Sequence, residues 1–141
     1  DRGLSMTDFR KVTDDFSVAW QIAAEDVARA RADGYVLVIN NRPDNEAPGQ
    51  AASADIAAAC EEAGLAYIWI PVVGGPTRAQ AEVMAEAVAE ASGKVLAFCR
   101  SGTRSINTWA LGQALAGARS PAELVELGMN AGYDLRPLLG G

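Results

Sequence analysis

Short apolar runs alternate with stretches of helical spacing along the chain. Residues 35–40 (YVLVIN) and 94–98 (KVLAF) are runs of five or six mostly apolar residues, which are typical of buried strands. In the stretches between such runs, apolar residues recur every three or four positions, as one buried helix face requires. Glycine and proline separate the segments, and the pattern contains no internal repeat.

The pattern predicts the elements in order. Residues 9–13 and 16–20 form an opening strand pair, which indicates a hairpin. Further strands are expected over residues 35–40, 65–72 and 94–98, and helices over residues 23–34, 53–64, 77–93, 105–118 and 121–132.

Helix starts and helix faces follow from the same pattern. Ser53 and Thr77 are the predicted N-caps of two helices, and Pro121 begins the last one. The helix after Thr77 is expected to bury an apolar face made of Val83, Met84, Ala87, Val88 and Ala91.

Strands that alternate with helices imply an α/β fold, with a mainly parallel central sheet flanked by helices. In such folds the carboxyl ends of parallel strands meet at one edge, where ligands bind. Three loops are expected to converge there, over residues 40–50, 72–76 and 99–104. The third loop carries an obvious nucleophile, the thiol of Cys99.

The size of the chain fits one domain. It has 141 residues, half of them apolar, which suits a single core over residues 6–141. Residues 1–5 precede Met6 and are expected to be a remnant that is not native. No apolar run approaches the roughly 20 residues that a membrane crossing needs, and the opening residues lack the apolar centre of a secretion signal. We therefore expect a cytoplasmic protein without a membrane partner.

Charge and residue counts restrict the chemistry further. With 18 acidic and 12 basic side chains the net charge is -6, which repels a nucleic acid backbone. The chain has two cysteines and no histidine, so one chain cannot build a zinc site from Cys and His, and we expect no metal or cofactor. The lack of histidine also removes every Ser-His and Cys-His catalytic pair. Any nucleophile must be activated by something other than imidazole.

The segment CRSGTRS, residues 99–105, follows a predicted strand and precedes a predicted helix. Its N–H groups are expected to point inward, and the helix N-terminus adds about half a positive charge. Such a loop binds anions and, with two arginines, favours a thiolate at Cys99, whereas the alternative is a buried core cysteine. Gly102 allows the positive φ of the curl, and Ser105 is placed to donate a hydrogen bond to the thiolate or to an anion. The expected anion-binding residues of the loop are Arg100, Ser101, Gly102, Thr103 and Ser105.

Two families use a loop of this kind. CRSGTRS resembles the active loop of single-domain rhodaneses, sulfurtransferases in which a cysteine, an adjacent arginine and a closing basic residue surround a persulfide. It also resembles the loop of dual-specificity phosphatases, which has a histidine before the cysteine and five residues between cysteine and arginine. Here Phe98 precedes Cys99, and four residues separate Cys99 from Arg104. Whether Arg104 closes the loop stays open, because Ser105 stands where the longer phosphatase loop has its arginine.

The order of motifs over roughly residues 6–139 carries a wider resemblance. DFSVAWQI, GYVLVINNRPDNEAPGQ, AGLAYIWIPV, VLAFCRSGTRS and AGYDL together resemble the bacterial phosphatase-like domain of beta-lactamase-hydrolase-like proteins. The resemblance implies a dual-specificity protein tyrosine phosphatase-like fold, in a family also catalogued as sulfurtransferases. It implies as a partner a metallo-hydrolase domain of the persulfide dioxygenase type, to which some members are fused. Because a fold does not decide a function, the site must do so.

Loop length favours sulfur transfer. A phosphoryl group in flight has three oxygens that need donors, whereas a loop shortened by one residue fits a single terminal sulfur better. We therefore expect Cys99 to take sulfur from an anionic donor, thiosulfate or glutathione persulfide, and to hold it as a persulfide, with Arg104 as the second catalytic residue. The first alternative is a phosphatase that acts on a phosphate ester through a phosphocysteine, with Asp44 as the acid. The second is a module that binds an anion or persulfide without turnover.

Residues outside the loop complete the candidate set. Arg42 and Asp44 lie on a loop expected at the same sheet edge, where they bind substrate or pair with Arg104, and the alternative is that they only form a turn. Gly74 and Gly75 either approach the cysteine loop or form a tight turn. Cys60 is expected to pack in the core from its helix. The tryptophans expected to fill the core or line a pocket are Trp20, Trp69 and Trp109.

Overall fold

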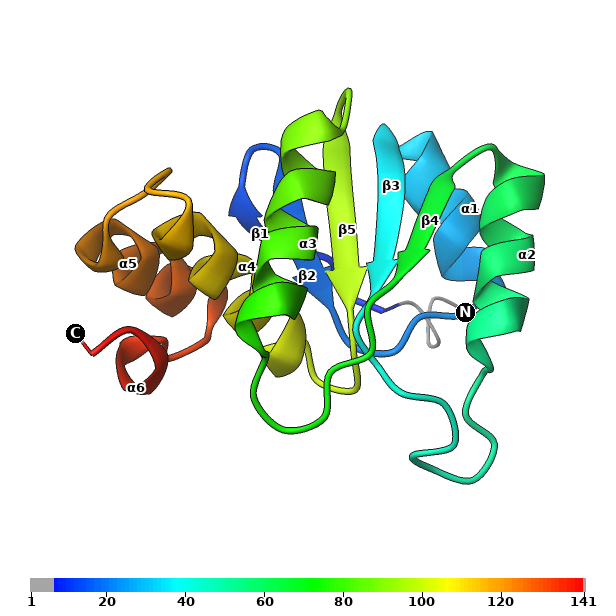
Figure 1. Cartoon of the computed structure of the whole chain (residues 1–141). Helices are drawn as coiled ribbons and strands as arrows, with labels where there is room; N and C mark the ends of the chain where they lie inside the picture. Colours follow the sequence, from blue (N-terminus) through cyan, green and yellow to red (C-terminus); the bar gives the residue numbers. More distant parts are fainter. Residues whose placement is uncertain (1–6, 141) are drawn as a thin grey trace.

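A five-stranded sheet with the order β1-β2-β5-β3-β4 organises the chain (Figure 1). The computed structural model describes residues 7–140, so the remnant expected at residues 1–5 lies outside the described part. The strands are β1 (Arg10–Thr13), β2 (Phe16–Ala19), β3 (Tyr35–Asn40), β4 (Ala66–Trp69) and β5 (Lys94–Phe98). The helices are α1 (Ala24–Ala32), α2 (Ser53–Ala63), α3 (Arg78–Glu90), α4 (Thr103–Leu115), α5 (Pro121–Ala131) and α6 (Arg136–Leu139).

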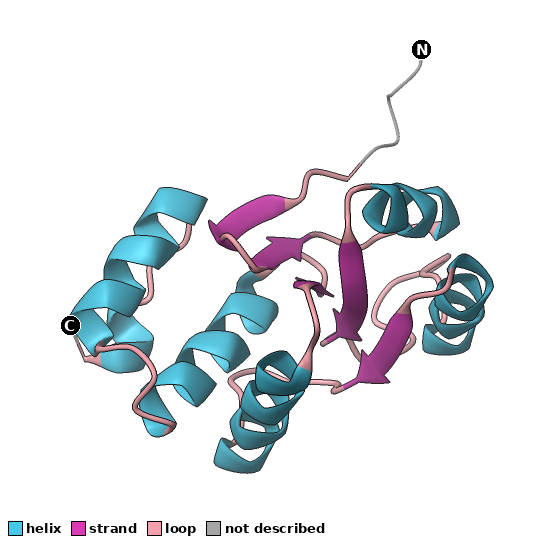
Figure 2. Cartoon of the chain, turned by 90° about the horizontal axis from the view of Figure 1, so that it is seen from above, coloured by secondary structure: helices cyan, strands magenta, loops and turns pink. Residues whose placement is uncertain are grey.

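The sheet is mostly parallel, as the alternation of strands and helices predicts. β1 and β2 form the predicted antiparallel hairpin, while β2, β5, β3 and β4 pair in parallel. Figure 1 shows the loops after β3, β4 and β5 leaving the same edge of the sheet. Figure 2 shows helices on both faces, which a parallel sheet needs because its strands are buried on both sides.

Two apolar clusters hold these layers together. On the face covered by α3, α4 and α5, the Trp109 ring stacks on Phe16 with ring centroids 4.8 Å apart. On the face covered by α1 and α2, Cys60 is fully buried, which confirms its expected place in the core. Burial raises the pKa of the Cys60 thiol to about 11, so this cysteine is inert at neutral pH.

Helix starts follow the predictions except at α2 and α4. Thr77 caps α3 as predicted, since its side chain accepts a hydrogen bond from the Gln80 N–H at 3.1 Å. Ser53 is not the cap of α2: it is the first helical residue, and its hydroxyl bonds to Tyr67 at 2.5 Å instead. The predicted start of α4 is two residues late, because Gly102 is its N-cap.

The other differences concern exposure and length. Val83, predicted on the buried face of α3, is 50% exposed, because α3 covers the sheet with a narrower stripe that includes Ala81 and Met84. The short helix α6, four residues long, was not predicted, since one turn is too short to show periodicity. Within residues 7–140, no helix combines the length and the apolar character that a membrane crossing requires.

Candidate active site

Cys99 follows β5 at the carboxyl edge of the sheet, and its side chain is fully buried. Its backbone N–H donates to the Ala19 carbonyl at 3.4 Å, so the end of β2 holds the start of the loop. The Gly102 N–H donates to Cys99 Sγ at 3.1 Å. The loop thus curls back on the sulfur and points an amide at it, a contact that stabilises a thiolate.

Gly102 is required at its position for two reasons. Its φ of +86° lies in the left-handed region, which favours glycine. In addition, a Cβ there would lie 2.2 Å from the Tyr133 hydroxyl oxygen, because the Tyr133 ring packs against the loop. The same hydroxyl donates to the Ser101 carbonyl at 2.9 Å, so Tyr133 fastens the loop from the segment after α5.

The N-terminus of α4 lies directly behind Cys99. Its first turn contains Thr103, Arg104 and Ser105 and no acidic residue, so the positive end of the helix dipole is not neutralised locally. The Ser105 hydroxyl is fully buried and has no hydrogen-bond partner among the described residues. The role predicted for it, donation to a thiolate or an anion, stays a prediction.

Arg104 is bound by a carboxylate from a distant loop. Its Nη1 and Nη2 donate to the two carboxylate oxygens of Glu46 at 2.7 and 2.8 Å, and Nη1 also donates to the Val72 carbonyl at 2.8 Å. These contacts bring together the loops after β3, β4 and β5. The hydrogen bond to Glu46 is the main cause that raises the pKa of Arg104, and the nearby charge of Cys99 adds to it.

Glu46 also binds Arg42. The Arg42 Nε donates to Glu46 Oε1 at 2.9 Å, and its Nη1 donates to Gln21 Oε1 at 3.0 Å. Arg42 is only 4% exposed, so its charge is balanced by a partner inside the protein. The hydrogen bond from Arg104, followed by that from Arg42, lowers the pKa of Glu46 to about 2. Arg42 therefore reaches Arg104 through Glu46 and not directly.

In the described part of the chain, the other predicted site residues form no side-chain hydrogen bond or ion pair with Cys99 or Arg104. The Asp44 carboxylate accepts the Ser53 N–H at 2.8 Å, so it caps α2 in place of the predicted serine. Arg100 is exposed and forms no ion pair within residues 7–140. Gly74 has a positive φ, and both Gly74 and Gly75 have open space around them, which favours the tight-turn interpretation of both.

Two tryptophans expected in the core or a pocket lie at the surface of this edge. Trp20 is 54% exposed and Trp69 is 44% exposed, while Trp109 fills the core as predicted. The difference arises because Trp20 and Trp69 lie at or just after strand ends, where helices no longer cover the sheet. Trp69 Nε1 donates to the Arg42 carbonyl at 2.9 Å, which fastens the loop after β3.

Sequence reasoning missed Glu46, Gln21 and Tyr133. Glu46 carries a signal in hindsight, because it is an acidic residue on a loop expected to meet two arginines. Nothing local marks Gln21 or Tyr133, since their roles depend on contacts across the fold.

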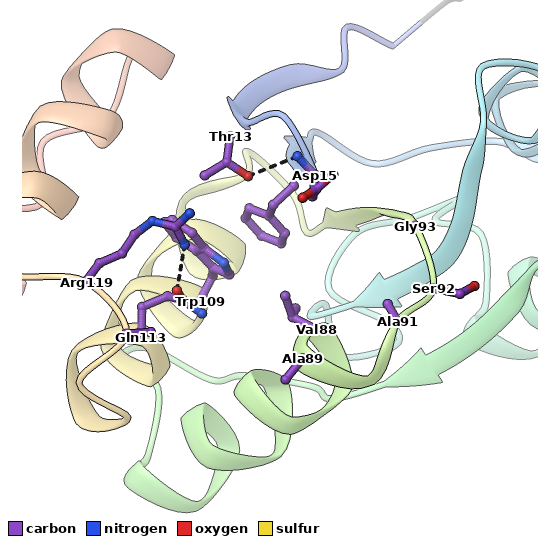
Figure 3. Close-up of a pocket in the computed structure, with 12 residues that line it drawn as sticks. Thr13, Asp15, Val88, Ala89, Ala91, Ser92, Gly93, Trp109, Gln113 and Arg119 are labelled. Carbon is purple, nitrogen blue, oxygen red and sulfur yellow. Dashed lines mark hydrogen bonds between the residues drawn. The ribbon is translucent and has the colours of Figure 1, made fainter.

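A cavity of about 460 Å³ lies at the opposite edge, by the amino ends of β2 and β5 (Figure 3). Its polar walls include Arg119 and Gln113, whose side chains bond to each other at 2.7 Å. It contains no cysteine, and we do not assign the chemistry to it. Among the described residues, no cluster of three or more His, Cys, Asp and Glu is suited to hold a metal ion.

Comparison with known families finds one that the sequence resembles over most of its length. Residues 8–116 match the sequence model of the phosphatase-like domain of beta-lactamase hydrolase-like protein. A beta-lactamase hydrolase-like protein of Agrobacterium fabrum is 35% identical over 127 residues, or 89% of this chain and 29% of that protein. One from Xylella fastidiosa is 40% identical over 103 residues, or 72% of this chain and 24% of that protein. The chain thus spans less than a third of the length of these relatives.

Solved structures agree on the fold. A candidate phosphatase from Neisseria meningitidis superposes with a TM-score of 0.81 at 26% identity and covers 94% of each chain. TpbA of P. aeruginosa, solved in complex with phosphotyrosine, superposes with a TM-score of 0.61 at 16% identity, covering 99% of this chain and 96% of that one. These similarities confirm the predicted fold, that of dual-specificity and tyrosine phosphatases.

Proposed function

The chain belongs to the family of phosphatase-like domains of beta-lactamase hydrolase-like proteins, and we propose that it uses Cys99 as the nucleophile in the transfer of a small anionic group. The observation that carries the proposal is the hydrogen bond from the Gly102 N–H to Cys99 Sγ at the start of α4. The comparisons support a phosphate ester as the first candidate substrate. They do not confirm the predicted sulfur transfer.

In phosphoryl transfer, the Cys99 thiolate attacks phosphorus and the bond to the ester oxygen breaks. The leaving alkoxide or phenoxide departs with the electron pair of that bond, and a phosphocysteine remains. Amides of residues 100–105 and the Arg104 guanidinium would balance the charge on the phosphoryl oxygens. Water then attacks phosphorus, which releases inorganic phosphate and restores the thiolate. Because Cys99 has no exposed surface, the loop must shift as substrate enters.

The leaving oxygen needs a proton unless it departs as a stable anion. The Asp44 carboxylate already accepts a hydrogen bond from the Ser53 N–H. Hydrogen bonds from Arg104 and Arg42 lower the pKa of Glu46 to about 2, so Glu46 is ionised at neutral pH. Neither arrangement favours a general acid. These contacts favour esters with good leaving groups, such as aryl phosphates, over alkyl phosphates.

Sulfur transfer is the second candidate, favoured by the spacing of four residues between Cys99 and Arg104. The thiolate attacks the outer sulfur of thiosulfate or glutathione persulfide, and the S–S bond breaks. Sulfite or glutathione leaves with the electron pair, so no acid is needed, and Cys99 holds a persulfide. A thiolate acceptor then takes the outer sulfur. The transfer makes a persulfide of the acceptor, and a persulfide dioxygenase-type domain in the rest of a longer protein would be suited to consume that persulfide.

One experiment separates the candidates. Wild-type protein, Cys99→Ser and the control Cys60→Ser are assayed for p-nitrophenyl phosphate hydrolysis and, by intact mass, for sulfur gained from thiosulfate. If Cys99→Ser abolishes phosphate release and Cys60→Ser does not, the phosphatase is supported. If wild-type protein and Cys60→Ser gain the mass of one sulfur atom and Cys99→Ser does not, the sulfurtransferase is supported. Stabilisation by phosphate or thiosulfate without either reaction would mean a binding module. Full activity of Cys99→Ser would overturn the mechanism.

A further inference from the structure

The geometry points to Glu46 as the positioning residue of this site: we propose that it turns Arg104 so that one edge of the guanidinium, formed by Nε and Nη2, faces the anion held at Cys99. The proposal rests on the function proposed above and adds a residue to it. Glu46 itself touches neither the sulfur nor, in this proposal, the substrate.

Two of the five N–H donors of Arg104, on the edge formed by Nε and Nη2, are left free by its contacts with Glu46 and Val72. A guanidinium has five N–H donors in a plane: one on Nε, two on Nη1 and two on Nη2. Glu46 takes one from Nη1 and one from Nη2, and the Val72 carbonyl takes the second from Nη1. The donors left are Nε–H and one Nη2–H, which are parallel and lie on one edge. Two parallel donors match two oxygens of a phosphate or a thiosulfate.

The edge is available where the reaction takes place. Arg104 lies in the first turn of α4, two residues after the N-cap Gly102, whose amide contacts Cys99 Sγ. The Arg104 side chain is 18% exposed, so it is enclosed but still reachable from the surface. Glu46 and Val72 hold the opposite side of the guanidinium, which prevents rotation about its long side chain.

Glu46 is itself held rigidly enough to do this. Its backbone N–H donates to Gln50 Oε1 at 2.9 Å, and the Arg42 Nε donates to its Oε1, the oxygen that Arg104 Nη2 also contacts. Arg42 in turn is buried and bound to Gln21, from the segment after β2. Four side chains, Gln21, Arg42, Glu46 and Arg104, thus form one chain of hydrogen bonds across the carboxyl edge of the sheet.

This arrangement gives a reason for the short loop. With four residues between Cys99 and Arg104, the loop has less backbone with which to orient its own arginine. Glu46, 58 residues away in sequence, supplies the missing restraint from the loop after β3. A net charge of one positive unit remains on the group of Arg42, Glu46 and Arg104, which still attracts an anion.

A double-mutant cycle tests the proposal with the substrate that shows turnover in the assays above. Glu46→Gln is expected to lower kcat about 100-fold, as a small misplacement of a catalytic group does, while KM changes less than threefold. In an Arg104→Ala background the same change should have almost no further effect, because Glu46 acts through Arg104. Glu82→Gln, which removes a carboxylate paired with Arg78 on the surface of α3, is the control and should keep wild-type kcat.

Two kinetic outcomes overturn the proposal. Equal losses from Glu46→Gln in both backgrounds would mean that Glu46 only supports the fold, and a rise in kcat would mean that Glu46 holds Arg104 away from the anion. A second readout does not depend on turnover: inorganic phosphate titrated into wild-type protein should shift the ¹⁵N signal of Arg104 Nε, and Glu46→Gln should abolish that shift. If this shift is seen without any reaction, the proposed function fails while the role of Glu46 stands. If phosphate binds without moving the signal, the proposal is wrong.

Discussion

The two ends of the sheet differ in how they combine charge and space. At the carboxyl end, the Gly102 amide contacts the Cys99 thiol, and beside it two arginines are joined by hydrogen bonds through one carboxylate. At the amino end lies a cavity of about 460 Å³, with one arginine at its wall and the Phe16 and Trp109 rings beside it (Figure 3). β5 connects the two ends and, with five residues, separates them by roughly 16 Å. The open cavity and the site of the proposed reaction are therefore in different places.

The comparison teaches that the proposed chemistry depends on where the strands end rather than on where the largest open volume lies. Parallel strands bring their carboxyl ends and the start of the next helix to one edge, where backbone donors accumulate. The amino ends bring the end of α3 and the turn after α4 together, and these carry carbonyl groups and small residues. A nucleophile that needs positive potential is served by the first end alone.

The largest expected contrast is between the arginines of the two ends. Arg104→Lys should lower kcat about 100-fold, because an ammonium group cannot offer two parallel donors to an anion. Arg119→Lys at the cavity should leave kcat within twofold, since Arg119 bonds to Gln113 and, at 3.4 Å, to Glu123, and lies over the Trp109 ring, all of them far from Cys99 in the fold. Steady-state kinetics of both variants measure the contrast. If Arg119→Lys had the larger effect, the cavity would belong to the active site.

The next contrast compares two glycines with positive φ. Gly102→Ala meets both an unfavourable φ and the Tyr133 hydroxyl, whereas Gly117→Ala meets the φ alone, with open space around it. In each variant the strain of a positive φ at alanine should lower the free energy of unfolding by about 1–3 kcal/mol. Only Gly102→Ala should also lower kcat, by about 10-fold, because the Cys99 loop must move away from Tyr133. Adding Tyr133→Phe should restore part of the loss. Equal effects of both glycines would mean that Tyr133 does not shape the loop.

Most of the fold was predictable because it depends on local patterns. The hairpin, the three later strands and the Thr77 cap all follow from spacing and residue type within a few positions. The position of the site was predictable, because the strand order brings its loops to one edge of the sheet. The hydrogen bonds between its side chains were not, because they depend on rotamers and on distances between residues far apart in sequence. Glu46 binds Arg104 across 58 residues, and no local rule connects them. Asp44 caps α2 for the same kind of reason, since its partner Ser53 lies beyond a loop.

Glu46 also makes the carboxyl end sensitive to acid. Its pKa is lowered from 4.5 to about 2, so the folded state binds its proton less readily than the unfolded state does. The stability it adds is complete above pH 4.5 and is lost as the pH falls toward 2. Glu46→Gln should therefore lose about 1–2 kcal/mol at pH 7 and little at pH 2 in urea unfolding, allowing for partial exposure. Asp134→Asn, which breaks an exposed pair with Arg136, is the control and should change the pH profile less. Parallel pH profiles of wild type and Glu46→Gln would contradict this.

The smallest expected effect concerns Asp44 and decides whether it is a helix cap or a general acid. Asp44→Asn keeps an oxygen that can accept the Ser53 N–H, so both stability and kcat should stay close to wild type. Asp44→Ala removes the acceptor and should cost about 0.5–2 kcal/mol of unfolding free energy, again with little change in kcat per folded molecule. A general acid would behave otherwise, because Asp44→Asn would slow esters with poor leaving groups about 100-fold or more and aryl esters much less. Measuring both variants with an aryl and an alkyl phosphate therefore decides whether the loop after β3 contributes an acid to Cys99 or only the carboxylate of Glu46.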